Sequence, residues 1–91
     1  MKIQVTEVHL KKGIRCNPHW CPVALAFMDA GLRNVSVGPN MMSFKYWNKD
    51  KEGCISAFEQ THILPNEMID FIHKFDNKIP VDPTEFDMEI T

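Results

Sequence analysis

Several features that mark specialised small proteins are scarce in this sequence. It has only three cysteines among 91 residues, an odd number that does not suit the paired disulfides of a small secreted fold. No stretch approaches the roughly 18 consecutive apolar residues that a membrane-crossing helix needs. Residues 1–5 alternate polar and apolar side chains, so they lack the apolar core of a secretion signal. These absences argue against a membrane protein and a secreted disulfide scaffold, and we expect a cytoplasmic location.

Charge of one sign is not in excess either. The sequence has ten Lys and Arg and twelve Asp and Glu, which gives a formal net charge of -2. Neither sign of charge forms a long run. A protein that grips nucleic-acid phosphates usually presents a basic face, because its affinity depends on neutralising those phosphates. A nucleic-acid partner is therefore disfavoured. We expect a protein partner, and a homodimer is compatible with the sequence.

Recognisable catalytic motifs are missing as well. The sequence contains no phosphate-binding loop, dinucleotide fingerprint, paired-carboxylate motif or Ser/His/Asp signature. In a chain this short, each absence removes a class of enzyme. We therefore predict a protein that is not an enzyme and that carries no cofactor and no metal.

Two alternatives to that prediction rest on Cys16 and Cys21, which flank His19. A structural zinc ion needs four ligands, normally in two closely spaced pairs, and only one such pair is visible. A zinc-stabilised module would have to use Cys16, Cys21 and histidine side chains. The second alternative is a small thiol enzyme centred on Cys21, because a thiol at the start of a helix can have a lowered pKa.

Three segments have the pattern of helices. Thr6 can cap a short helix over residues 7–12, which Gly13 ends as a residue able to enter the left-handed conformation. A second helix is predicted over residues 22–30. Its proline suits the first helical position, its cap is Cys21, and its apolar character nearly all round predicts burial on most sides. Residues 65–76 place hydrophobic side chains at spacings of three and four, which predicts the third helix.

Alternating side chains predict four strands, and a β-branched and aromatic run predicts a fifth. They lie near residues 2–5, 34–37, 42–47, 54–58 and 84–91. The middle three are joined by short connections, which favours an antiparallel meander. We therefore predict a single α+β domain over residues 1–91. Its sheet has about five strands, mainly antiparallel, with the helices over 22–30, 65–76 and 7–12 packed on one face.

The candidate partner-binding residues lie on two of these strands. Trp47 occupies the polar register of its strand beside Lys45, and tryptophan is enriched at binding hot spots. The outer face of the last strand is acidic, with Glu85, Asp87 and Glu89 in alternate positions. Such a row suits either a solvated face that resists aggregation or contact with a basic partner.

Residues 13–26 read GIRCNPHWCPVALA, and this segment resembles a family of small phage, prophage and bacterial proteins. Members have a K-I-x-V-T strand before a short helix, a C-P-[IV]-A-L-A helix start, and a P-V-x-P linker before a final strand near Phe86. The resemblance implies a phage or prophage setting, hence the host cytoplasm, but no activity. Pro18 stands where several such sequences are expected to have a cysteine, and this weakens a metal site carried over from the family.

The sequence therefore predicts a non-enzymatic protein that binds a macromolecular partner. In its concrete form, the hypothesis is a phage accessory factor that inhibits a host defence complex, in the manner of anti-CRISPR proteins. The candidate contact residues are Lys45, Trp47, Glu85, Asp87 and Glu89.

Overall fold

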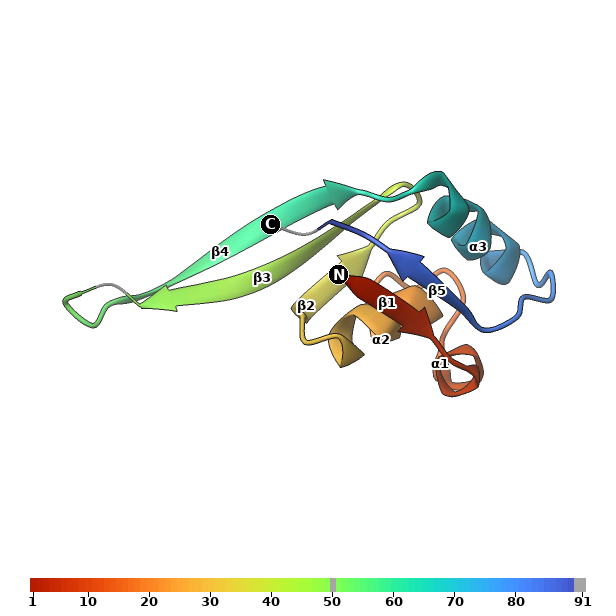
Figure 1. Ribbon diagram of the computed structural model, residues 1–91, viewed down its shortest axis with the longest axis horizontal. Helices are drawn as coiled ribbons and strands as arrows, with labels where there is room; N and C mark the ends of the chain where they lie inside the picture. Colours follow the sequence, from red (N-terminus) through yellow and green to blue (C-terminus); the bar gives the residue numbers. More distant parts are fainter. Residues whose placement is uncertain (50, 90–91) are drawn as a thin grey trace.

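The part of the chain that the structure describes forms five strands and three helices. This computed structural model describes residues 1–49 and 51–89, apart from the side chains of residues 47 and 48. The elements are β1 (Lys2–Val5), α1 (Glu7–Lys12), α2 (Pro22–Asp29), β2 (Arg33–Val37), β3 (Met41–Lys49), β4 (Ile55–Ile63), α3 (Asn66–Asp76) and β5 (Thr84–Asp87) (Figure 1). None of these helices combines the length and apolar character of a membrane-crossing segment.

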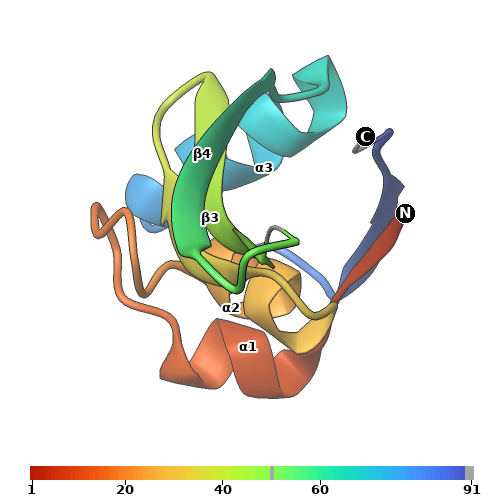
Figure 2. The same ribbon diagram turned by 90° about the vertical axis from the view of Figure 1, so that its left-hand side faces the viewer.

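The strands form two sheets. β1 and β5 pair antiparallel as one sheet, and β2, β3 and β4 form the other in that order. The mixed α and β content and the antiparallel meander of the middle strands are confirmed. The predicted single five-stranded sheet is wrong. Figure 2 shows the β1–β5 pair on one side of the molecule and the β3–β4 hairpin on the other.

Helix α2 explains why one sheet does not form. It contacts β2, β1 and α1, and five of its eight residues are buried: Pro22, Val23, Ala24, Ala26 and Phe27. A helix that is apolar nearly all round must be covered on several sides. One sheet with all helices on one face would cover it from one direction only. Splitting the strands into two sheets lets β1 and β2 both contact α2.

Local signals fixed the helix boundaries. The Cys21 side chain accepts a hydrogen bond from the Ala24 amide, with Pro22 at the start of α2 as predicted. Thr6 caps α1, while α3 begins one residue later than expected, with Pro65 as its N-cap. Four strands differ in length from the predictions: β2 begins one residue earlier, at Arg33, and β3 extends beyond both ends of the predicted 42–47. β4 runs on to Ile63, and β5 ends at Asp87, with residues 90–91 of the predicted strand outside the described residues.

The hydrophobic core takes side chains from both sheets and from helices α2 and α3. Its fully buried side chains include Ile3 of β1, Phe27 of α2 and Met68 of α3. Met42 of β3 is only 1 % exposed. The rings of Phe71 and Phe86 meet edge to face with centroids 5.6 Å apart, which holds α3 against β5.

One part of the three-stranded sheet extends past this core. β2 pairs with β3 only as far as Lys45, whereas the β3–β4 pairing continues to Lys49 and Ile55. Residues 46–49 of β3 and 55–58 of β4 therefore form a two-stranded projection, here called the arm (Figure 1). It accounts for the elongated shape of the molecule, which measures 51 × 23 × 20 Å.

Candidate functional site

The arm carries an aromatic stripe that begins in the core and ends in solvent. Tyr46 lies directly opposite Phe58, and their rings stack with centroids 5.5 Å apart. Phe44, two residues before Tyr46 on the same face, has its ring 6.3 Å from that of Tyr46. Exposure rises outward along the stripe, from 7 % at Phe44 to 44 % at Phe58. The stripe is thus a continuation of the core that other elements do not cover.

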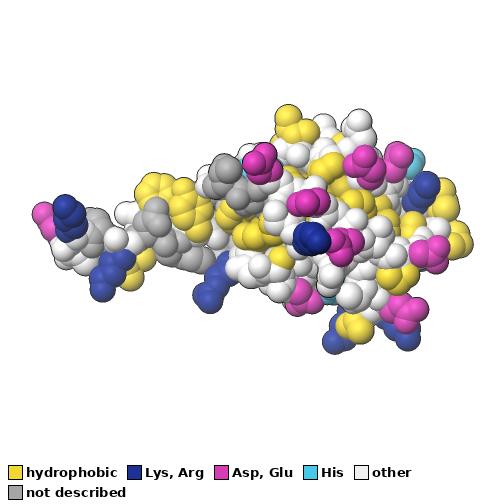
Figure 3. Space-filling model, in the orientation of Figure 1, with side chains coloured by type: hydrophobic (Ala, Val, Ile, Leu, Met, Phe, Trp, Pro, Cys, Tyr) yellow, Lys and Arg dark blue, Asp and Glu magenta, His cyan; other side chains and the backbone are white. Residues whose placement is uncertain are grey.

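The opposite face of the arm is exposed too. It carries Lys49 opposite Ile55, and the Ile55 side chain is 68 % exposed. Lys45 and its register partner Glu59 lie just before the arm, on the same face. Figure 3 shows hydrophobic surface on the arm with lysine side chains along its edge and near its tip. A two-stranded ribbon exposed on both faces adds little to the core, and exposed apolar strands favour aggregation. Large exposed apolar surface of this kind commonly marks a site of interaction.

Of the predicted contact residues, Lys45 and Trp47 belong to this hairpin. Lys45 is exposed at the base of the arm, where the β2–β3 pairing ends. The backbone of Trp47 lies within the arm, opposite Ala57. The side chain of Trp47 lies outside the described residues. Sequence reasoning missed Tyr46, Ile55 and Phe58 as surface candidates because their pattern is that of any half-buried strand.

The predicted acidic residues lie on the other sheet. The Glu85 carboxylate is 3.7 Å from the Lys2 ammonium and accepts a hydrogen bond from the Gln4 amide at 3.2 Å. Asp87 is 3.5 Å from the amino-terminal ammonium of Met1. Glu89 is exposed just after β5. The structure therefore gathers the acids on β5 and its extension, not on the arm, and partly neutralises two of them.

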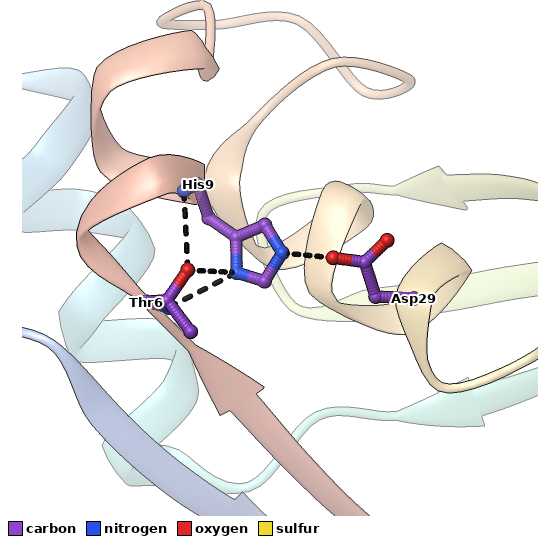
Figure 4. A network of polar contacts seen from close by, with 3 residues as sticks. All are labelled: Thr6, His9 and Asp29. Carbon is purple, nitrogen blue, oxygen red and sulfur yellow. Dashed lines mark hydrogen bonds and ion pairs between the residues drawn. The ribbon is translucent and has the colours of Figure 1, made fainter.

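A hydroxyl–imidazole–carboxylate arrangement, of which only the imidazole is buried, joins α1 to α2 (Figure 4). His9 is the buried polar residue of the core. Its Nδ1 accepts a hydrogen bond from the Thr6 backbone amide at 3.0 Å, so the ring proton lies on Nε2, which donates to the Asp29 carboxylate. The Thr6 hydroxyl in turn accepts from the His9 amide.

The arrangement of Thr6, His9 and Asp29 has a structural explanation. A general base must be free to take a proton from the hydroxyl, but Nδ1 is already occupied by a backbone donor. The reciprocal Thr6–His9 bonds are a helix capping box. The His9–Asp29 bond also places a donor beside a carboxylate at the C-terminal end of α2, where the helix dipole disfavours negative charge. The network therefore holds α1 on α2.

The cysteines predicted as alternative sites flank a cavity of about 360 Å³. Cys16, Cys21 and Asp76 line it, and the Cys16 amide donates to the Asp76 carboxylate at 3.0 Å. Cys21 is 4 % exposed, and desolvation raises the pKa of its thiol despite the helix amides that it faces. A nucleophilic thiol needs the opposite shift.

His19, the third member of that motif, points elsewhere. Its Nδ1 donates to the Val35 carbonyl oxygen at 3.0 Å, and the cavity beside Cys16 and Cys21 is not lined by it. Within residues 1–49 and 51–89, no group of three or more His, Cys, Asp or Glu side chains is placed to hold a metal ion.

Comparisons with known proteins add no assignment. The chain matches no protein-family model, no curated protein and no solved structure at a significant level. The case for a function therefore rests on the geometry of the arm.

Proposed function

We propose that this protein acts by binding a protein partner through the arm, without catalysing a reaction. The observation that carries the proposal is the aromatic stripe, which leaves the core at Phe44 and ends at the exposed Phe58. Burying Phe58 and Ile55 in a complex would stabilise that complex by ~25 cal/mol for each Å² of apolar surface removed from water.

The chemistry of the arm indicates what the partner presents. Stacked aromatic rings are effective anchors because they bury a large area at a small cost in conformational entropy. Lys45 and Lys49 are exposed on the opposite face of the same hairpin. The partner surface that fits is an apolar cleft with carboxylates at its rim, because rim charges of opposite sign speed association and fix orientation.

A narrower form of the proposal follows from the family resemblance. In that form the partner is a subunit of a host defence complex, and the protein is a phage-type inhibitor. Small size, the lack of catalytic motifs and the acidic residues Glu85, Asp87 and Glu89 support it at the level of sequence. The identity of the captured partner decides between the narrow form and the general one.

The proposal is tested by affinity capture with matched surface variants. Phe58→Ser changes the arm, and Val8→Ser changes an apolar side chain of α1 that is 54 % exposed and lies away from the arm. We expect a stoichiometric partner to be retained by the wild type and by Val8→Ser, and to bind Phe58→Ser at least tenfold more weakly, since anchor residues commonly contribute ~2 kcal/mol or more.

Purified partner and isothermal titration then give the affinities directly. Equal affinity of the partner for Phe58→Ser and the wild type would show that the arm is not the contact element. Loss of binding by both variants alike would do the same. Finding no stoichiometric partner for the wild type counts against a binding function altogether.

A further inference from the structure

The outer edge of β4 lacks the features that normally prevent strands from pairing between molecules. Its nine residues, ISAFEQTHI, contain no proline, no glycine and no lysine, and Glu59 is the one charged side chain. Its register with β3 is unbroken over all nine pairs, and β4 is the last strand of its sheet among the described elements. Natural edge strands are usually short, bulged or charged, because an open edge is a template for another strand.

We propose that two copies of this chain pair through their β4 edges, antiparallel and with Phe58 on the two-fold axis. This goes beyond the proposed function and does not depend on it. In a symmetric antiparallel pair the axis is perpendicular to the sheet, so it passes through one residue position, which meets its own copy. The registers to compare are therefore those centred on successive residues of β4.

Charge and chain geometry select among these registers. Centring on Glu59 gives the longest overlap but places two carboxylates directly opposite each other, which is destabilising. Centring on Gln60 sets Ile55 of the second copy against Pro65, beyond the end of β4 at Ile63 and at the start of α3. Centring on Ala57 leaves only residues 55–59 paired. Centring on Phe58 pairs residues 55–61 within the strand and sets Glu59 opposite Ala57.

This register also makes the side chains of the two copies complementary. Tyr46 and Phe58 are already neighbours on one face, so the dimer forms a row of four rings, Tyr46 and Phe58 of one copy followed by Phe58 and Tyr46 of the other. Ser56 lies opposite Gln60 of the second copy, and their side chains can hydrogen-bond. Lys45 stays the register partner of Glu59 within each hairpin. The two edge strands become the centre of a six-stranded sheet.

The contact is modest in size. Seven residues span about 24 Å at ~3.4 Å per residue, and a single strand edge offers less than the roughly 800 Å² per partner of a standard interface. We therefore expect a reversible dimer with a micromolar dissociation constant.

Sedimentation velocity across the micromolar range tests the oligomeric state. The wild type is expected to shift from monomer to dimer as concentration rises. Phe58→Lys places two ammonium groups at the axis and is expected to weaken the dimer at least tenfold, with an unchanged circular dichroism spectrum because Phe58 is 44 % exposed. Ile63→Lys is the matched control, since Ile63 is 80 % exposed on the same strand but outside the seven pairs.

Thiol cross-linking tests the register without changing Phe58. In a chain carrying Cys16→Ser and Cys54→Ser, one sample carries Ser56→Cys and another carries Gln60→Cys. When the two samples are mixed, a short thiol cross-linker is expected to join a Ser56→Cys chain to a Gln60→Cys chain. In either sample alone, it is not expected to join two chains. Within one chain the two positions are four residues apart, about 13 Å along a strand.

Three results would overturn the inference. They are a monomer at every concentration, a dimer unaffected by Phe58→Lys, and cross-linking of Ser56→Cys with itself in preference to Gln60→Cys. A monomer would leave the proposed partner binding intact, because affinity capture measures that separately.

Discussion

Gly13 shows how one residue can be required for a reason other than its own backbone conformation. The sequence suggested a left-handed glycine at the end of α1, but Gly13 has φ −67° and ψ 144°, which any residue can adopt. A Cβ atom there would lie 2.5 Å from Cγ of Pro22 and 2.8 Å from the His9 carbonyl oxygen. The glycine is needed because the Pro22 ring at the start of α2 packs directly on it.

We expect Gly13→Ala to lower the free energy of unfolding by about 1–3 kcal/mol, the usual cost of forcing extra atoms into a packed site. Gly38→Ala is the control, because its Cβ would lie 3.3 Å from one carbonyl oxygen and should cost less than about 1 kcal/mol. Urea unfolding of both variants measures the difference. Similar costs for the two would show that Pro22 yields to the added methyl.

Cys21 gives a second prediction for a single residue. Burial raises the pKa of its thiol, whereas Cys16 is exposed. At neutral pH we expect iodoacetamide to label Cys16 in the folded protein and to leave Cys21 unmodified until the protein unfolds, because the thiolate is the reactive form. Peptide mass spectrometry of labelled samples measures this. Labelling of Cys21 at the rate of Cys16 would contradict the buried cap and revive a thiol-based activity.

The same shift has a direction in stability. The folded state holds the Cys21 proton more tightly than the unfolded state. The contribution of the protonated thiol to the free energy of unfolding is therefore complete below the ordinary thiol pKa. It is lost as the pH rises through that value toward the raised pKa of the folded protein. Cys21→Ser keeps a capping oxygen and should lack this part of the alkaline loss.

Among the elements, the arm and the core strands should differ sharply in their contribution to stability. Ile3 of β1 is fully buried, and Ile55 of the arm is 68 % exposed. We expect Ile3→Ala to cost about 2–5 kcal/mol, because it leaves a cavity. Ile55→Ala should change stability by no more than ~0.5 kcal/mol. Chemical denaturation of both variants tests this pair. A large cost for Ile55→Ala would mean that the arm is part of the folding unit and not a surface for binding.

The elements that the sequence predicted well are those governed by near neighbours. Thr6 and Cys21 act as caps within one turn of their helices, so the sequence alone located α1 and α2. The predicted strand over 54–58 already covered the arm side of β4, and the part it missed was residues 59–63. Residues 59–62 are all polar, so they lack the apolar pattern that predicts a strand.

At the scale of the molecule, the division into two sheets was beyond sequence reasoning. The alternation in β1 and β5 shows that each has one buried face, but it does not show which strand lies beside which. That choice depends on α2, whose apolar surface is met from two directions by β1 and β2. The candidate site was found in part: Lys45 and Trp47 were placed on the correct hairpin, while Phe58 and Ile55 became candidates only once the arm was seen to project.

The pairing of β1 with β5 has a consequence for how the chain folds during synthesis. Gln4 and Glu85 are register partners although 81 positions separate them. β1 is therefore synthesised well before its neighbour β5, and until β5 has been made Ile3 and Val5 lack one side of their cover. We expect the meander and α2 to assemble early from contacts close in sequence, and the closing of this sheet to be the late, slow event.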